Sequence, residues 1–209
     1  GVRLLFSVLC RLEVRGLEHY PAEGPYVLVI NHLHWLDLPA VFTTFRHFTA
    51  GLMKKKWDRH PFAGPLMRWV GHAIAIDTGR PDPRAVASAR RWLEQGGVLL
   101  VAPEGTRSRS GALAEGLRGA AFLANRTGAP LLPVAMWGQE HVFAGWRRLR
   151  RPEVHVQVGA PIYWDWTSAR APSDELDRCT RTVMARLADM LPESYRGVYA
   201  ALSDPSGNA

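Results

Sequence analysis

Cysteine and long apolar runs are both scarce in this sequence of 209 residues, and each scarcity excludes a class of protein. The two cysteines, Cys10 and Cys179, are too few for a disulfide framework and lack a metal-ligand spacing. The eight histidines include no His-x-x-x-His or His-Glu-x-x-His pattern, so we expect no bound metal and assign no cofactor. With no secretory signal evident, we expect the protein in a reducing compartment.

The apolar stretch at the start of the chain is too short to span a bilayer, which takes about twenty residues. We expect residues 1–11 to form a short apolar helix that lies in the membrane interface or packs on the core. No repeat and no linker rich in glycine or serine divides the chain after it, so residues 12–202 are predicted to form one domain. Residues 203–209 are expected to be a flexible tail.

Apolar runs alternate with helical patterns along this domain. Strands are predicted near 26–30, 73–77, 97–102, 131–136 and 153–158, and helices near 38–46, 62–70, 83–95, 117–127 and 174–190. This order predicts an α/β fold in which helices flank a largely parallel central sheet. Asp37 is expected to cap the first of these helices, and Ser173 or Asp174 the last.

A histidine and an aspartate follow the first buried strand. His32 comes just after that strand, and Asp37 stands five residues later, at a predicted helix start. A tight turn between them would bring the Asp37 carboxylate to one imidazole nitrogen, fix the tautomer and leave the other nitrogen free as a base. Alternatively, Asp37 only caps its helix and His32 only binds backbone groups of the loop.

A second polar cluster, Pro103 to Ser108, follows the buried strand predicted at 97–102. The active sites of α/β proteins collect at such strand ends. Gly105 allows a ligand to approach the backbone, Thr106 supplies a hydroxyl, and Arg107 offers a planar fork suited to phosphate. Alone, this is more often a turn with a surface arginine, but together the two clusters predict an active site that binds phosphate.

The two clusters resemble the glycerolipid acyltransferases of the lysophosphatidic acid acyltransferase type. That family carries a His-x-x-x-x-Asp block, matched by His32 to Asp37, and a Pro-Glu-Gly-Thr-Arg-Ser block, matched by Pro103 to Ser108. Residues 71–77 resemble the family's glycerol-phosphate-binding strand, and residues 131–135 resemble its final apolar block. The chain departs from the family at His34, where serine is usual, and at Thr78, where arginine is common.

The resemblance implies transfer of an acyl chain from a thioester, carried by coenzyme A or acyl carrier protein, to the free hydroxyl of 1-acylglycerol-3-phosphate. The product would be phosphatidic acid. His32 is expected to act as the base and Asp37 to orient it and stabilise its imidazolium. Because no serine or cysteine stands in a nucleophile-elbow setting, we expect direct transfer without an acyl-enzyme.

The resemblance also implies which residues hold the acceptor. Its phosphate is assigned to three neighbouring residues and two basic residues elsewhere: Gly105, Thr106, Arg107, Arg80 and Lys55. Arg80 would supply the charge that the family carries at the position of Thr78. Glu104 is expected to bind the glycerol hydroxyls or to fix the loop, away from the phosphate, because its charge would repel that group.

The charge pattern indicates a membrane surface as partner. The net charge is +7, and only three of the 26 basic residues are lysines, all at 54–56. A basic run, Arg147 to Arg151, follows Phe143 and Trp146, and basic residues beside aromatic rings suit an anionic lipid surface. A solvated surface run is the alternative. We expect a membrane-associated protein, peripheral or monotopic, on the cytoplasmic face of the cell membrane, and no nucleic-acid partner because no such motif is present.

Three other functions stay open at this point. The acceptor could be a different lysolipid or an acylated amino-acid lipid. The chain could be a catalytically idle membrane-binding protein of the same fold, although a binding module has no need of a paired base and carboxylate. It could also be a thioesterase that uses the same base to activate water.

Overall fold

The computed structural model describes residues 8–45, 49–54, 73–76 and 82–202, and its centre is a seven-stranded sheet. The strands are β1 (Arg11–Arg15), β2 (Tyr26–Ile30), β3 (Thr49–Lys54), β4 (Ala73–Ile76), β5 (Val98–Val101), β6 (Leu131–Trp137) and β7 (Glu153–Val158). Their order across the sheet is β1-β7-β6-β2-β5-β3-β4. Every neighbouring pair is parallel except β6 and β7, which are antiparallel. The predicted α/β fold with a largely parallel sheet is therefore confirmed.

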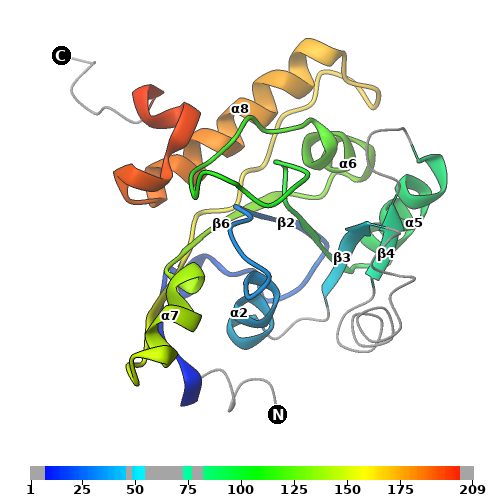
Figure 1. Ribbon diagram of the computed structural model, residues 1–209. Coiled ribbons are helices and arrows are strands. Elements are labelled where there is room, and N and C mark those ends of the chain that lie inside the picture. Colours follow the sequence, from blue (N-terminus) through cyan, green and yellow to red (C-terminus); the bar gives the residue numbers. More distant parts are fainter. Residues whose placement is uncertain (1–7, 46–48, 55–72, 77–81, 203–209) are drawn as a thin grey trace.

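Helices cover both faces of the sheet, which makes three layers (Figure 1). The α-helices are α2 (Asp37–Thr44), α5 (Pro83–Glu94), α6 (Gly119–Thr127), α7 (Val142–Arg147) and α8 (Ser173–Met190). Short 3-10 helices are η1 (Leu17–His19), η2 (Gln139–His141), η3 (Glu193–Tyr195) and η4 (Gly197–Leu202). Among the helices in these described ranges, none is long and apolar enough to cross a membrane.

The alternation of side chains along β2 explains the layers. Val27 and Val29 belong to a core cluster shared with α5, α6 and α8, whereas Leu28 and Ile30 belong to a second cluster shared with α2 and α7. Successive residues of a strand point to opposite faces, so a strand that is apolar throughout must be buried on both sides. All five residues of β2 are buried, and the loop that carries His32 and Asp37 follows this central strand directly.

Two strands and one helix were not predicted. β1 alternates charged and apolar residues and lies at one end of the sheet, where its exposed Arg11 pairs with Glu153 at 3.3 Å. β3 has only one β-branched residue, Thr49, and is a strand because it pairs with β4 and β5. α7 is only six residues long and includes Gly145, which is a poor helix former. In each case tertiary pairing or packing outweighs local propensity.

Other predictions differ at the helix starts or lie beyond the described residues. Leu36 is the N-cap of α2 and Pro172 that of α8, so the expected caps at Asp37 and at Ser173 or Asp174 were wrong. Asp37 is instead the first residue of α2, and its carboxylate turns back to the preceding loop. The predicted helix at 62–70, the tail at 203–209 and most of the expected N-terminal helix lie outside the described residues. Cys10 is buried, and β1 begins at the next residue.

Candidate active site

The two polar clusters meet where the parallel strands β2 and β5 end. Carboxyl ends of parallel strands share one edge of the sheet, so the loops that follow them are neighbours. The Ser108 amide donates a hydrogen bond to the His32 carbonyl at 2.7 Å. The His32 amide donates to Glu104 Oε1 at 2.9 Å. The residues from Pro103 to Ser108 and His32 therefore form one structural unit, as the sequence predicted.

The predicted contact between His32 and Asp37 is present. His32 Nδ1 lies 2.6 Å from Asp37 Oδ2, within the range of a charge-assisted hydrogen bond. The Asp37 side chain is fully buried, whereas 29% of the His32 side chain is exposed. With Nδ1 engaged by the carboxylate, Nε2 is the nitrogen left to meet a substrate. A buried carboxylate that orients a part-exposed imidazole has the geometry of a base and its orienting partner.

Three further donors hold the Asp37 carboxylate in place. The backbone amides of Leu33 and His34 each donate to Oδ2 at 3.0 Å, and Gln139 Nε2 donates to Oδ1 at 2.8 Å. A buried carboxylate is costly unless such bonds replace its lost hydration. The tight turn that the sequence suggested is thus built around the carboxylate itself, and the position of His32 depends on it.

Glu104 fixes two segments of backbone. Its Oε1 accepts from the amide of His32, and its Oε2 accepts from the amide of Ala114 at 3.0 Å. Only 7% of the residue is exposed, and this burial raises the pKa of Glu104 above its ordinary value, opposed by the two backbone hydrogen bonds. Of the two roles that the sequence left open, this geometry fits loop fixing, since both carboxylate oxygens are occupied.

Gly105, Thr106 and Arg107 form the exposed rim of the site. Gly105 has φ +67°, and a Cβ there would lie 2.9 Å from Leu117 Cδ1, so the turn requires glycine. Thr106 and Arg107 are exposed, and within the described ranges no carboxylate pairs with the Arg107 guanidinium. Arg107 is therefore available to bind an anion. Lys55 and Arg80, the other residues assigned to the acceptor, lie outside the described residues.

His34, where the family usually has serine, lies between the His32–Asp37 pair, called the dyad below, and a group of aromatic rings. Its ring centroid lies 5.8 Å from those of Trp35 and Phe143. Burial lowers the pKa of His34, opposed by the nearby Asp37 carboxylate and reinforced by the positive charge of Arg107. Arg107 is thus close enough to influence the electrostatics of the loop that carries the dyad.

Two residues that support the site were not identified from the sequence. Asn31 is fully buried, and its side chain joins the ends of β2 and β6 by donating to the Met136 carbonyl and accepting from the Met136 amide, at 2.7 and 2.8 Å. Gln139 follows β6 and reaches Asp37 from 102 residues away in sequence. The only available signal was position, since Asn31 stands directly after β2 and Gln139 stands two residues after the end of β6. In the described part of the chain, no group of three or more acidic, histidine or cysteine side chains is placed to hold a metal.

Comparison with known proteins identifies the family. The profile of the Acyltransferase family matches residues 11–137, which is more than half of the chain and includes both clusters. The chain belongs to the acyltransferase family. It is an O-acyltransferase by that membership, and the matched range ends at Trp137, the last residue of β6.

Individual relatives of this acyltransferase share most of its length. It is 32% identical over 206 residues to the human 1-acyl-sn-glycerol-3-phosphate acyltransferase alpha, covering 97% of this chain and 68% of the human protein. The mouse protein of the same name is 36% identical over 198 residues, and there this chain spans 65% of the relative's length. The 1-acyl-sn-glycerol-3-phosphate acyltransferase of Bacillus subtilis is 23% identical over 192 residues, covering 91% of this chain and 93% of that protein.

A solved structure has the same fold as this acyltransferase. The crystal structure of the 1-acyl-sn-glycerophosphate (LPA) acyltransferase from Thermotoga maritima matches with a TM-score of 0.67 and 24% sequence identity. The match covers 87% of this chain and 73% of that one. At this identity the likeness supports the fold alone.

Proposed function

We propose that this acyltransferase transfers an acyl chain from a thioester to the free hydroxyl of 1-acylglycerol-3-phosphate, forming phosphatidic acid for phospholipid synthesis. The donor thioester would be acyl-CoA or an acylated acyl carrier protein. The observation that carries the proposal is the 2.6 Å contact between His32 and the buried Asp37, beside an exposed arginine. The names of its relatives support the same acceptor.

The chemistry follows from the free imidazole nitrogen. His32 Nε2 removes the proton from the acceptor's hydroxyl while the hydroxyl oxygen attacks the thioester carbonyl carbon. The carbon–sulfur bond then breaks, the new ester bond remains, and His32 returns its proton to the departing thiolate. Asp37 holds Nδ1 and stabilises the imidazolium that exists between these two steps.

The acceptor's phosphate is proposed to bind Arg107, with the backbone of Gly105 and the hydroxyl of Thr106 beside it. Arg107 is exposed at the rim, on the same loop that Glu104 ties to the His32 amide. A guanidinium binds phosphate through two parallel hydrogen bonds, which fixes the orientation of the acceptor as well as its affinity. Lys55 and Arg80 stay proposed members of this clamp on the strength of sequence alone.

We also propose that the enzyme works at a membrane, on the cytoplasmic face of the cell membrane, because acceptor and product are both lipids. Residues 1–11 and the basic runs are proposed to contribute to this attachment. The net charge of +7 favours anionic lipid over neutral lipid.

The test is to incubate the purified protein with a labelled acyl thioester and a panel of lysophospholipids, and to identify the product. We expect labelled phosphatidic acid from 1-acylglycerol-3-phosphate, and no product with His32→Ala. His19→Ala is a matched control, since the His19 ring is hydrogen-bonded to the carbonyl of Val158, the last residue of β7, at 3.1 Å and has no hydrogen bond to the residues of this site in the described chain. Free fatty acid without an acceptor would indicate a thioesterase, and acylation of another lysolipid alone would change the assigned acceptor.

A further inference from the structure

Three large apolar side chains are exposed around α7 and the turn after it. Trp35, Phe143 and Leu149 have 59%, 39% and 98% of their surface exposed. The rings of Trp35 and Phe143 stack, with centroids 5.7 Å apart and planes inclined by 15°. Scattered apolar residues are normal on a protein surface, but several gathered in one place mark an interaction site.

The turn after α7 holds Leu149 out into solvent. The amides of Arg148 and Arg150 both donate to the Gly145 carbonyl, at 2.9 and 3.0 Å, and the Leu149 amide donates to the Trp146 carbonyl at 3.0 Å. Leu149 has φ +53°, a conformation that residues other than glycine rarely adopt. Neither backbone preference nor burial within the described chain favours leucine at this position. Its exposed side chain is therefore better explained by a partner than by folding.

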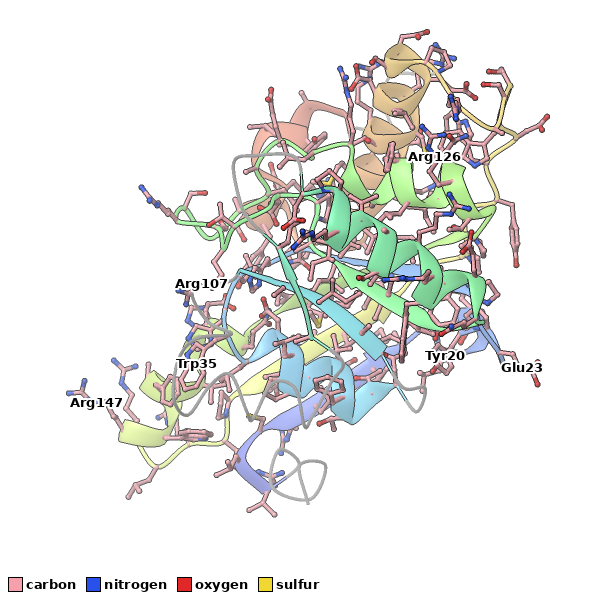
Figure 2. The ribbon with its side chains drawn as sticks, turned by 90° about the vertical axis from the view of Figure 1, so that its right-hand side faces the viewer. Tyr20, Glu23, Trp35, Arg107, Arg126 and Arg147 are labelled. Atoms are coloured by element: carbon pink, nitrogen blue, oxygen red, sulfur yellow. The ribbon has the colours of Figure 1, made fainter. Side chains whose placement is uncertain are left out.

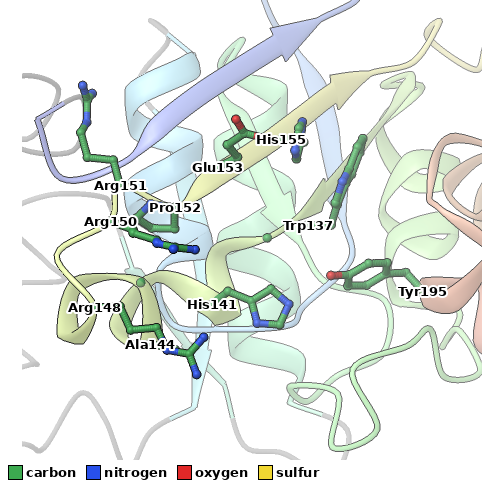
Figure 3. A pocket seen from close by; sticks show the side chains of 12 residues that line it. Trp137, His141, Ala144, Arg148, Arg150, Arg151, Pro152, Glu153, His155 and Tyr195 are labelled. Atoms are coloured by element: carbon green, nitrogen blue, oxygen red, sulfur yellow. The ribbon is translucent and has the colours of Figure 1, made fainter.

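Arginines surround this apolar tip. Arg147, Arg148 and Arg150 are exposed, and no carboxylate of the described ranges pairs with any of them. Arg148 and Arg150 line a pocket of about 500 Å³, together with His141 and Trp137 (Figure 3). Figure 3 shows the side chain of Arg150 and the ring of His141 extending toward this pocket. Glu153 also lines this pocket, and its carboxylate pairs with Arg11 at 3.3 Å, so Arg148 and Arg150 stay available to attract phosphate groups.

This surface is continuous with the active site. Trp35 belongs to the loop between His32 and Asp37, and the Phe143 ring also contacts His34, with centroids 5.8 Å apart. Figure 2 shows Trp35, Arg107 and Arg147 on the same side of the molecule. A partner bound at this surface of the enzyme would therefore face the dyad and Arg107.

We infer that this surface, made of Trp35, Phe143 and Leu149 with Arg147, Arg148 and Arg150, docks the enzyme on an anionic membrane. The apolar side chains enter the interface, while the arginines bind lipid phosphates. The inference rests on the proposed function, because a lipid acceptor lies in the bilayer and docking through this surface brings the dyad to its hydroxyl.

The first experiment measures binding to vesicles by flotation. Vesicles of phosphatidylcholine are compared with vesicles that also contain phosphatidylglycerol, at low and high salt. Each basic residue at an anionic surface strengthens binding about fivefold, so Arg148→Gln with Arg150→Gln should weaken binding to anionic vesicles about 30-fold at low salt. The loss should shrink at high salt, because screening reduces the contribution of the arginines in the unmodified protein.

Leu149→Gln should weaken binding about tenfold or more to both kinds of vesicle, with little dependence on salt, because the lost contribution is apolar. The matched controls lie on the opposite layer. Arg181→Gln with Arg186→Gln on α8 changes the net charge equally, and Val198→Gln in η4 removes an exposed apolar side chain. If the control variants lose as much binding as the variants at Arg148, Leu149 and Arg150, the surface is not the docking site.

The second experiment separates docking from chemistry. Activity is measured with acceptor held in anionic vesicles and with a short-chain, monomeric lysophosphatidic acid in solution. The variants at Arg148, Leu149 and Arg150 should lose activity only on vesicles. Equal loss on the soluble acceptor would mean that these residues bind substrate, which would overturn the inference. If the unmodified enzyme acylates no lysophosphatidic acid, the proposed function fails, while the vesicle measurements still decide the docking surface.

Discussion

Replacing Asp37 by asparagine tests the mechanism most directly, because the surrounding donors determine how the amide must sit. Oδ2 accepts bonds from the backbone amides of Leu33 and His34 as well as from His32. An amide nitrogen in that place would face three N–H donors, so the asparagine oxygen should occupy it. The nitrogen then faces Gln139, whose Oε1 is buried without a hydrogen-bond partner in the described chain, so rotation of that amide would provide an acceptor.

This arrangement separates activity from stability. The variant keeps the bonds to Oδ2 and loses only the 3.1 Å bond that the His34 amide also donates to Oδ1, so the free energy of unfolding should fall by about 1–3 kcal/mol. His32 keeps its tautomer but loses the negative charge beside its imidazolium. A hydrogen bond to a charged group is worth about 1.5–3 kcal/mol, and about 1.4 kcal/mol corresponds to tenfold in rate, so kcat should fall about 10- to 100-fold.

Steady-state kinetics on the folded variant, with urea unfolding alongside, measures both quantities. Unchanged kcat would refute the role of Asp37 as the partner of the base. A fall of about 10⁴-fold, as when a triad histidine takes the wrong tautomer, would refute the orientation argued for the asparagine amide.

Three further predictions concern the neighbours of the dyad. Arg107→Ala should raise the KM for the lysophosphatidic acid acceptor about 10- to 100-fold and leave the KM for the thioester donor unchanged. Arg107→Lys should restore only part of the acceptor affinity, since an ammonium cannot form the paired bonds. A rise in the donor's KM instead would mean that Arg107 binds the donor and not the acceptor. Glu104→Gln places an amide donor against one of two backbone N–H groups, so the free energy of unfolding should fall by about 1–3 kcal/mol in urea titrations, and an unchanged value would contradict the loop-fixing role. Because the pKa of His34 is lower in the folded state, the unfolded chain binds the proton more readily, and the stability of the fold should decline as pH falls below about 6.5. His34→Ser should therefore reduce the drop in Tm between pH values of about 7.5 and 5.5. An equal drop in both proteins would show that another group is responsible.

The fold class and the neighbourhood of the site follow from local patterns in the sequence. Buried strands such as β2 read as unbroken apolar runs because both faces of a parallel sheet are covered. The polar residues that follow β2 and β5 were predictable as neighbours, since carboxyl ends of parallel strands share one edge. The contact between His32 and Asp37 was predictable as well, because it joins residues five positions apart and depends on one turn.

The long-range partners that support this turn depend on how distant segments of the chain pack. Gln139 reaches Asp37 across 102 positions, and Glu104 ties His32 to the segment that contains Ala114. No local pattern indicates such contacts, because they depend on how β6 and β5 align beside β2. For the same reason β3 became a strand against its weak propensity: its backbone groups need partners, and β4 and β5 supply them. Local sequence thus places the reacting groups, and the packing of distant segments holds them in position.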